Sequence, residues 1–365
     1  MQESPPCRDS ENEGLDRLIS TAIDTTPFQG AVRHLQSRFA SYVATCPAPL
    51  TAADLIVTPE IRVQSELYLP VAEIRAVFTR LYQSALRYSP ILSSTPFYNA
   101  LSWADAFNSL PTRFQFSANP ARLLEALLTD GTLLTEFLFA SFLPRRFYGG
   151  FARYPLQQEF IRNWLQQKNL HTVRCLDAAC GTGEGTYGVA RLLMDSGYRA
   201  ESVLTEGWTL EPLEVWAARA RCFPHDRTYE QRFRDETDLL FTGGYLTRIS
   251  FRTVDLTDPL MQTADSDQRD LILCNGLLGG PILHDTGKLQ QVISTLAELL
   301  VPGGILLAAD NFHAGWKQHC PHENLCSLLE QCGLNCCEAG EGISGSRSYD
   351  PAARQSAHFK VLCAA

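Results

Sequence analysis

An aspartate followed by a turn of small residues is the part of this sequence best suited to binding chemistry. Asp177 comes directly after a short apolar run, and the next residues read Ala178-Ala179-Cys180-Gly181-Thr182-Gly183-Glu184-Gly185. Glycine lets the chain adopt positive φ and lets backbone N–H groups approach a ligand closely. The pattern therefore predicts a site for a nucleotide or nucleoside at this turn.

The residues on either side predict the elements that hold this turn. Residues 173–176 are typical of a buried strand, and Tyr187, Val189, Ala190, Leu192 and Leu193 recur at helical spacing. Strand, glycine turn and helix in this order open a doubly wound α/β domain that binds nucleotides. Thr186 replaces the third glycine of the dinucleotide fingerprint, which disfavours an NAD-binding oxidoreductase, and the lysine of a P-loop is absent. An α/β loop that binds nothing remains an alternative.

Strands and helices are predicted to alternate downstream. We expect strands at 202–205, 249–254, 270–275, 305–309, 335–341 and 358–364, the last two forming an antiparallel hairpin. Helices are expected at 156–167, 211–222, 289–300 and 323–333. Pro302-Gly303-Gly304 is expected to form the turn that leads into the fifth strand.

The acidic residue, the Gly-x-Gly turn and the later Leu-x-Pro-Gly-Gly segment together resemble class I S-adenosylmethionine (SAM) methyltransferases. The resemblance runs from about Phe151 to the C-terminus. It implies an α/β fold with a Rossmann-like doubly wound seven-stranded sheet. It also implies SAM as the cofactor and S-adenosylhomocysteine (SAH) as its product, with the turn against the methionine end of SAM.

Ahead of this region the pattern is mostly helical. Helices are expected around 18–23, 32–43, 71–81, 121–128 and 133–142. We therefore predict a disordered tail at 1–14, a helical N-terminal domain at 15–148 and the SAM-binding domain at 149–365. The helical domain either shapes a substrate pocket or is a purely structural cap.

Two motifs resemble the chemotaxis receptor glutamate methyltransferases of the CheR type. One is Cys180-Gly-Thr-Gly-Glu-Gly-Thr-Tyr187, and the other is Phe151-Ala-Arg-Tyr-Pro155. The resemblance implies that Arg153 faces the cofactor, where it can bond to a carboxylate. The sequence departs from that family after the fourth strand, where Gly280 stands in place of an aromatic residue and the family's arginine is missing. The glycines there predict room for a larger or different acceptor.

The predicted site follows from these motifs. Glu206, at the expected end of the second strand, is predicted to accept the ribose hydroxyls. By resemblance, Asp255 binds the adenine amino group. The full set expected to bind the cofactor is Arg153, Asp177, Ala179, Cys180, Gly181, Gly183, Glu184, Glu206, Asp255, Leu256, Cys274, Asn275 and Gly276. The candidates for a base, or for a residue that positions the acceptor, are Tyr154, His284, Asp310 and His313.

These residues predict a SAM-dependent methyltransferase acting on a carboxylate, hydroxyl or amine of a small molecule or protein side chain. A non-catalytic SAM- or SAH-binding regulatory protein is the alternative. The 365-residue chain carries a net charge of -9, which argues against nucleic acid as a partner. It has no apolar run long enough to span a membrane and no signal peptide, so we expect a cytoplasmic protein.

The twelve cysteines are expected to remain reduced, with many of them packed in apolar elements. The group from His319 to Cys337 has no Cys-x-x-Cys pair, so no metal site is predicted there.

Overall fold

The computed structural model describes residues 14–46, 56–258, 268–309 and 319–348. The chain divides into two compact units. One comprises the chain up to Arg145 together with Cys222–Glu230, and the other comprises Arg146–Arg221 and the chain from Gln231 onward. The first boundary falls near the predicted one at 148, whereas the return of residues 222–230 to the first unit was not predicted.

The first unit is helical. Its helices are α2 (Gln29–Thr45), α3 (Pro59–Tyr68), α4 (Val71–Ala85), α5 (Trp103–Ser109), α6 (Pro120–Thr129) and α7 (Gly131–Phe142). Aromatic side chains fill its core, where the Phe78 ring stacks on Phe97 with centroids 4.4 Å apart and Tyr82 stacks on Phe137. The Asp130 side chain caps the start of α7.

One helix predicted in this unit is absent, and two helices were not predicted. Residues 18–23 do not form a helix; instead Ile19 pairs with Leu86 in an isolated bridge. The helices that were not predicted are α3 and α5, which begin at the side-chain caps Thr58 and Ser102. Both helices are short and carry little apolar periodicity, which hid them.

The second unit contains a seven-stranded sheet with the order β3-β2-β1-β4-β5-β7-β6. The strands are β1 (Val173–Asp177), β2 (Val203–Thr209), β3 (Ile249–Thr253), β4 (Arg269–Leu273), β5 (Leu300–Ala309), β6 (Leu334–Glu338) and β7 (Gly342–Arg347). The first five pair in parallel, and β7 is antiparallel to both of its neighbours. The strand order reverses direction between β1 and β4, so the predicted Rossmann-like doubly wound fold is confirmed.

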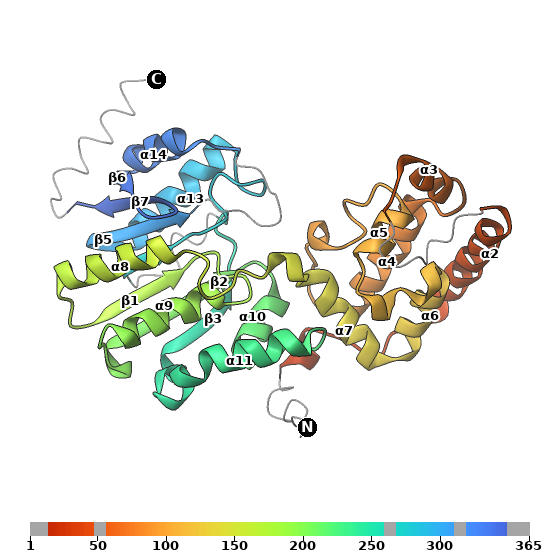
Figure 1. Ribbon diagram of the computed structural model, residues 1–365, viewed down its shortest axis with the longest axis horizontal. Coiled ribbons are helices and arrows are strands. Elements are labelled where there is room, and N and C mark those ends of the chain that lie inside the picture. The colour runs from red at the N-terminus through yellow and green to blue at the C-terminus, as the bar shows by residue number, and fades with distance from the viewer. Residues whose placement is uncertain (1–13, 47–55, 259–267, 310–318, 349–365) are drawn as a thin grey trace. The chain divides into compact units, whose positions relative to one another are not determined.

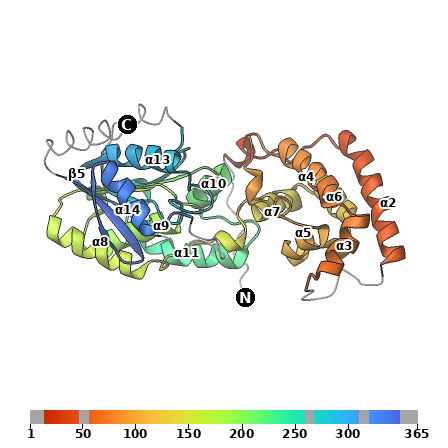
Figure 2. The same cartoon turned by 90° about the horizontal axis from the view of Figure 1, so that it is seen from above.

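Helices cover both faces of this sheet. They are α8 (Pro155–Lys168), α9 (Glu184–Asp195), α10 (Pro212–Ala220), α11 (Arg227–Thr242), α13 (Thr286–Leu299) and α14 (His322–Gln331). Within this unit, Figures 1 and 2 show α8 and α9 side by side on one face, with α13 on the other. The helices α13 and α14 share one apolar core with Leu176, Ile272 and Leu306 of the sheet.

Some strand boundaries differ from the predictions. The strand β2 continues past Glu206 to Thr209, and Pro302-Gly303-Gly304 lies inside β5 at a shift of register against β4. The second strand of the hairpin is β7, at Gly342–Arg347. The strand predicted at 358–364 lies outside the described residues.

The expectation that all the cysteines are reduced is wrong. Cys326 of α14 and Cys336 of β6 form a disulfide, and Cys222 is also disulfide-bonded. Cys175 and Cys274 are buried free thiols, as predicted. Within the described ranges no helix is both long and apolar enough to cross a membrane.

Candidate functional site

A pocket opens at the carboxyl ends of β1 and β4, where the strand order reverses. The empty space in it, with the open solvent at its mouth included, is about 710 Å³. It is bordered by the turn after β1, the first turns of α8 and α9, and the segment before α8. Five glycines line it: Gly149, Gly150, Gly181, Gly185 and Gly188. The backbone therefore forms much of the wall.

The turn after β1 needs glycine for two separate reasons. Gly181 has φ of +51°, and a Cβ built there would meet no atom within 4 Å. Gly185 has no unusual φ, but a Cβ there would lie 2.7 Å from the Asp177 carboxylate. The first glycine permits the turn and leaves the space beside it open, and the second lets α9 approach Asp177.

Asp177 ends β1 and lies in the pocket wall, 5% exposed. Burial raises the pKa of its carboxyl group to about 7, and the nearby Glu184 carboxylate raises it further. Hydrogen bonds from the Thr186 hydroxyl, at 3.0 Å, and from the Ala179 backbone oppose this pKa shift. Thr186 thus has a local role at the position where a dinucleotide fingerprint has glycine.

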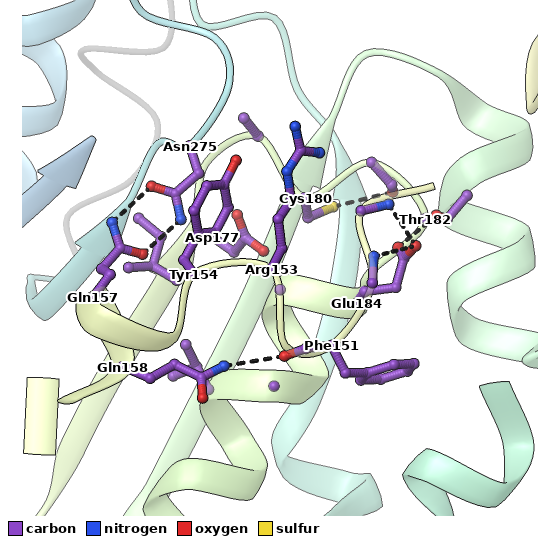
Figure 3. A pocket seen from close by; sticks show the side chains of 18 of the residues that line it. Phe151, Arg153, Tyr154, Gln157, Gln158, Asp177, Cys180, Thr182, Glu184 and Asn275 are labelled. Carbon is purple, nitrogen blue, oxygen red and sulfur yellow. Dashed lines mark hydrogen bonds between the residues drawn. The ribbon is translucent and has the colours of Figure 1, made fainter. Parts of the chain in front are cut away.

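Glu184 begins α9 and holds the segment before α8 against the glycine turn. Its carboxylate accepts hydrogen bonds from the backbone N–H of Gly149, at 2.9 Å, and of Gly150, at 3.4 Å. The Thr182 hydroxyl donates to its other oxygen at 2.6 Å. Figure 3 shows these bonds at one side of the pocket. A carboxylate is also favourable here because it lies at a helix N-terminus.

Arg153 and Tyr154 border the same pocket from the residues just before α8. The Arg153 guanidinium lies 5.3 Å from the centre of the Tyr154 ring. A Cβ at Gly276, which has φ of +68°, would lie 3.8 Å from the Tyr154 hydroxyl. The glycine after β4 therefore leaves the space beside that hydroxyl open.

Gln157 is a pocket residue that the sequence analysis missed. Its side-chain amide exchanges two hydrogen bonds with Asn275, at 3.0 and 2.8 Å, and Figure 3 shows this pair. The Asn275 oxygen also accepts from the backbone N–H of Ala309. The two amides are 118 residues apart in sequence, so no local pattern could have paired them.

Part of the set of residues predicted to bind the cofactor lies together around the pocket. The pocket is lined by Arg153, Asp177, Ala179, Cys180, Gly181, Glu184 and Asn275, and also by Tyr154. Gly183 instead packs against Ala218 and Phe251, where a Cβ would be 3.0 Å from each. Cys274 is fully buried in the apolar core below the site, and burial raises the pKa of its thiol.

The predicted position of Glu206 is wrong. It lies inside β2, opposite Leu176 of β1, and three residues before the strand ends. Its carboxylate pairs with Arg252 and, at 2.9 Å, with Arg269. Acidic side chains near the carboxyl end of β2 are instead those of Glu211, which caps α10, and Glu214. The Thr209 hydroxyl donates to Glu214, whose pKa burial raises to about 8.

Asp255 and Leu256 follow β3 as predicted but do not line the pocket. Asp255 is exposed, and its carboxylate accepts from the backbone and hydroxyl of Thr257. Leu256 is buried in the apolar core.

Of the candidates for a base, Tyr154 lines the pocket and His284 does not. His284 is exposed on the loop after β4, and its ring stacks on His319 at 4.8 Å. Asp310 and His313 lie outside the described residues. Among the residues that the structure describes, no three His, Cys, Asp or Glu side chains are placed to hold a metal ion.

No family model matches the chain, and no curated protein matches it. Similar solved structures include the N-methyltransferase NodS from Bradyrhizobium japonicum in complex with SAH. It is 16% identical with a TM-score of 0.35, and the match covers 60% of this chain and 100% of NodS. The sugar N-methyltransferase KedS8 from Streptoalloteichus is 17% identical with a TM-score of 0.35, over 53% of this chain and 87% of KedS8.

Another similar structure is the cyclase SpnF, with 19% identity and a TM-score of 0.33. That match covers 50% of this chain and 59% of the cyclase, less than two thirds of its length. Similarities of this size carry no argument about the reaction.

Proposed function

We propose that this protein is a SAM-dependent methyltransferase that acts on a carboxylate, hydroxyl or amine. The observation that carries the proposal is the glycine-bordered pocket at the strand-order reversal, with Asp177 buried in its wall. Doubly wound sheets bind nucleosides and nucleotides at this place. The motif resemblance at residues 180–187 supplies SAM as the specific candidate.

The pocket residues fit the chemical groups of SAM. The glycines in the wall allow backbone groups to contact a ligand. The Arg153 guanidinium suits the carboxylate of SAM. Asp177 and Glu184 give the wall a negative character that suits its ammonium and sulfonium charges. Glu206 pairs with two arginines, and neither it nor Glu211 or Glu214 lines the pocket, so none of the three is assigned to the ribose.

Bound SAM supplies a methyl group on a positively charged sulfur, which an acceptor lone pair attacks in line. The work of the protein is to align the acceptor and to exclude competing water. Tyr154, at the mouth beside Gly276, is our candidate for contacting the acceptor. The glycines after β4 leave space there, which fits an acceptor other than the receptor glutamate of the CheR type.

Calorimetric titration with SAM and SAH tests the cofactor. Wild type should bind both, and Gly181→Arg should weaken binding at least about 100-fold because a long side chain enters the pocket space. Gly197→Arg is the matched control, since Gly197 also has positive φ and an open Cβ position but does not line the pocket. Equal loss in both variants would show a folding defect. Wild-type binding of NADH without SAM would overturn the proposal.

A regulatory protein that binds SAM or SAH without transferring the methyl group is the second candidate. Transfer of labelled methyl from SAM to a panel of amines, alcohols and carboxylic acids separates the two. Tight binding with no labelled product across the panel would favour the regulatory role.

A further inference from the structure

The N-terminus of α8 is capped by a side chain that comes much later in the sequence. Glu341, in the turn between β6 and β7, accepts hydrogen bonds from the backbone N–H of Leu156 at 2.9 Å and of Gln157 at 2.8 Å. The residue at the N-cap position itself, Tyr154, provides no side-chain cap. The Glu341 carboxylate therefore satisfies two of the N–H groups that every helix leaves open at its start.

The backbone of the same turn is packed tightly onto α8. A Cβ at Gly340 would lie 2.3 Å from the Gln157 nitrogen and 2.6 Å from the Leu156 carbonyl carbon, and Gly340 has φ of +66°. Both the space and the conformation exclude a side chain at this position. The turn thus holds the start of α8 by close backbone contact as well as by the carboxylate.

The start of α8 is also a wall of the pocket. Arg153 and Tyr154 precede it, and Gln157 in its first turn pairs with Asn275 beyond β4. Asn275 in turn accepts from Ala309 at the end of β5. A continuous set of hydrogen bonds therefore joins the β6–β7 turn, the pocket wall and the carboxyl ends of two central strands.

We propose that Glu341 is a positioning residue of the pocket: it fixes the first turn of α8 and thereby the placement of Arg153, Tyr154 and Gln157. Glu341 does not line the pocket and acts only through α8. The part of the proposal that concerns ligand affinity rests on the proposed function. The part that concerns the order of α8 does not.

Hydrogen exchange of the full chain tests the positioning directly. Glu341→Ala should raise exchange about 10-fold or more in the amides of residues 156–158 and leave the amides of α9 unchanged. Glu341→Gln, which keeps one acceptor oxygen, should lie between wild type and Ala. The control is Glu338→Gln, which removes an exposed charge from the same hairpin and should leave exchange at residues 156–158 unchanged.

Titration with SAH supplies the second readout. The Kd should rise about threefold in Glu341→Gln and about tenfold in Glu341→Ala, and remain at the wild-type value in Glu338→Gln. Saturating SAH should in turn slow exchange at residues 339–342, because coupling between two sites is reciprocal.

The outcomes separate the two proposals. Unchanged exchange at residues 156–158 in both Glu341 variants overturns the positioning role. If exchange in α8 becomes faster but the Kd for SAH does not change, Glu341 only stabilises the helix, and the positioning role is also overturned. Failure of wild type to bind SAH overturns the proposed function, and the exchange experiment still decides whether Glu341 orders α8. If the Ala variant does not fold, the Gln variant gives the same comparison.

Discussion

At the scale of single residues, Asp177 combines a position in the pocket wall with nearly complete burial. Its pKa of about 7 means that the carboxyl is partly protonated near neutral pH when the pocket holds only water. A cationic ligand placed beside it favours the ionised form. Ligand binding and proton release should therefore be linked at this residue.

Titration of the wild type with SAM near pH 6.5, in buffers of different ionisation enthalpy, should show release of a fraction of one proton. Affinity should rise as pH increases toward about 8, because less work is then needed to ionise Asp177. Asp177→Asn should bind more weakly, by about tenfold, and lose this pH dependence. A wild type that binds SAM with no net proton release would contradict the linkage.

The site residues show which features a sequence can reveal. Asp177, Gly181 and Glu184 were found because they lie in one local motif whose spacing reflects its geometry. Glu206 was misplaced because a charge usually ends a buried strand, whereas here Arg252 and Arg269 neutralise it within β2. Gln157 and Glu341 were not found, since their partners are 118 and 184 residues away.

At the scale of elements, the sheet was predicted well except at its last hairpin. The strand β7 contains Gly342, Ser344 and Gly345, which have little strand preference, so it was not recognised. The structure explains the two glycines. A Cβ at Gly342 would lie 2.1 Å from the Ala308 carbonyl oxygen, and one at Gly345 would lie 2.9 Å from Leu334. Close approach to β5 and β6, rather than strand preference, selects them.

Gly342→Ala should therefore lower the free energy of unfolding by about 1–3 kcal/mol, because the methyl group forces β7 away from β5. Chemical denaturation of the purified variant measures this. Gly287→Ala is a suitable comparison, since Gly287 lies in the first turn of α13 with only ordinary contact around its Cβ. It should change stability by less than about 1 kcal/mol, in the stabilising direction. Similar losses in both variants would contradict the steric explanation.

At the scale of the whole molecule, the two units contain buried groups whose pKa shifts have opposite effects on stability. In the helical unit, burial lowers the pKa of His225 from 6.5 to about 4, while its ring bonds to the Leu143 carbonyl. At a pH between these two pKa values, His225 is protonated in the unfolded chain but not in the folded unit. This histidine therefore makes the first unit less stable as pH falls through that range.

The second unit should respond in the other direction. Asp177 and Glu214 have folded pKa values of about 7 and about 8, against 3.8 and 4.5 in the unfolded chain. At a pH between the unfolded and folded pKa values of each group, the carboxyl is protonated in the folded unit but ionised in the unfolded chain. Both carboxyl groups therefore make it less stable as pH rises through that range.

Scanning calorimetry from pH 5 to pH 8 should resolve two transitions whose temperatures shift in opposite directions. The transition temperature of the helical unit should rise and that of the second unit should fall, each by several degrees for changes on the order of 1–3 kcal/mol. Asp177→Asn should flatten only the second trend. Two transitions that move together, or a single cooperative one, would contradict this prediction.

The strand β6 at the edge of the sheet carries a cysteine that can be labelled selectively. Of the free cysteines in the described part of the chain, Cys337 is the exposed one, and it lies on the same hairpin that carries Glu341. A maleimide dye should therefore react there before it reaches the buried thiols. A fluorophore at that position would sit a few residues from the helix cap. Its emission could report pocket occupancy with every residue of the site left unchanged.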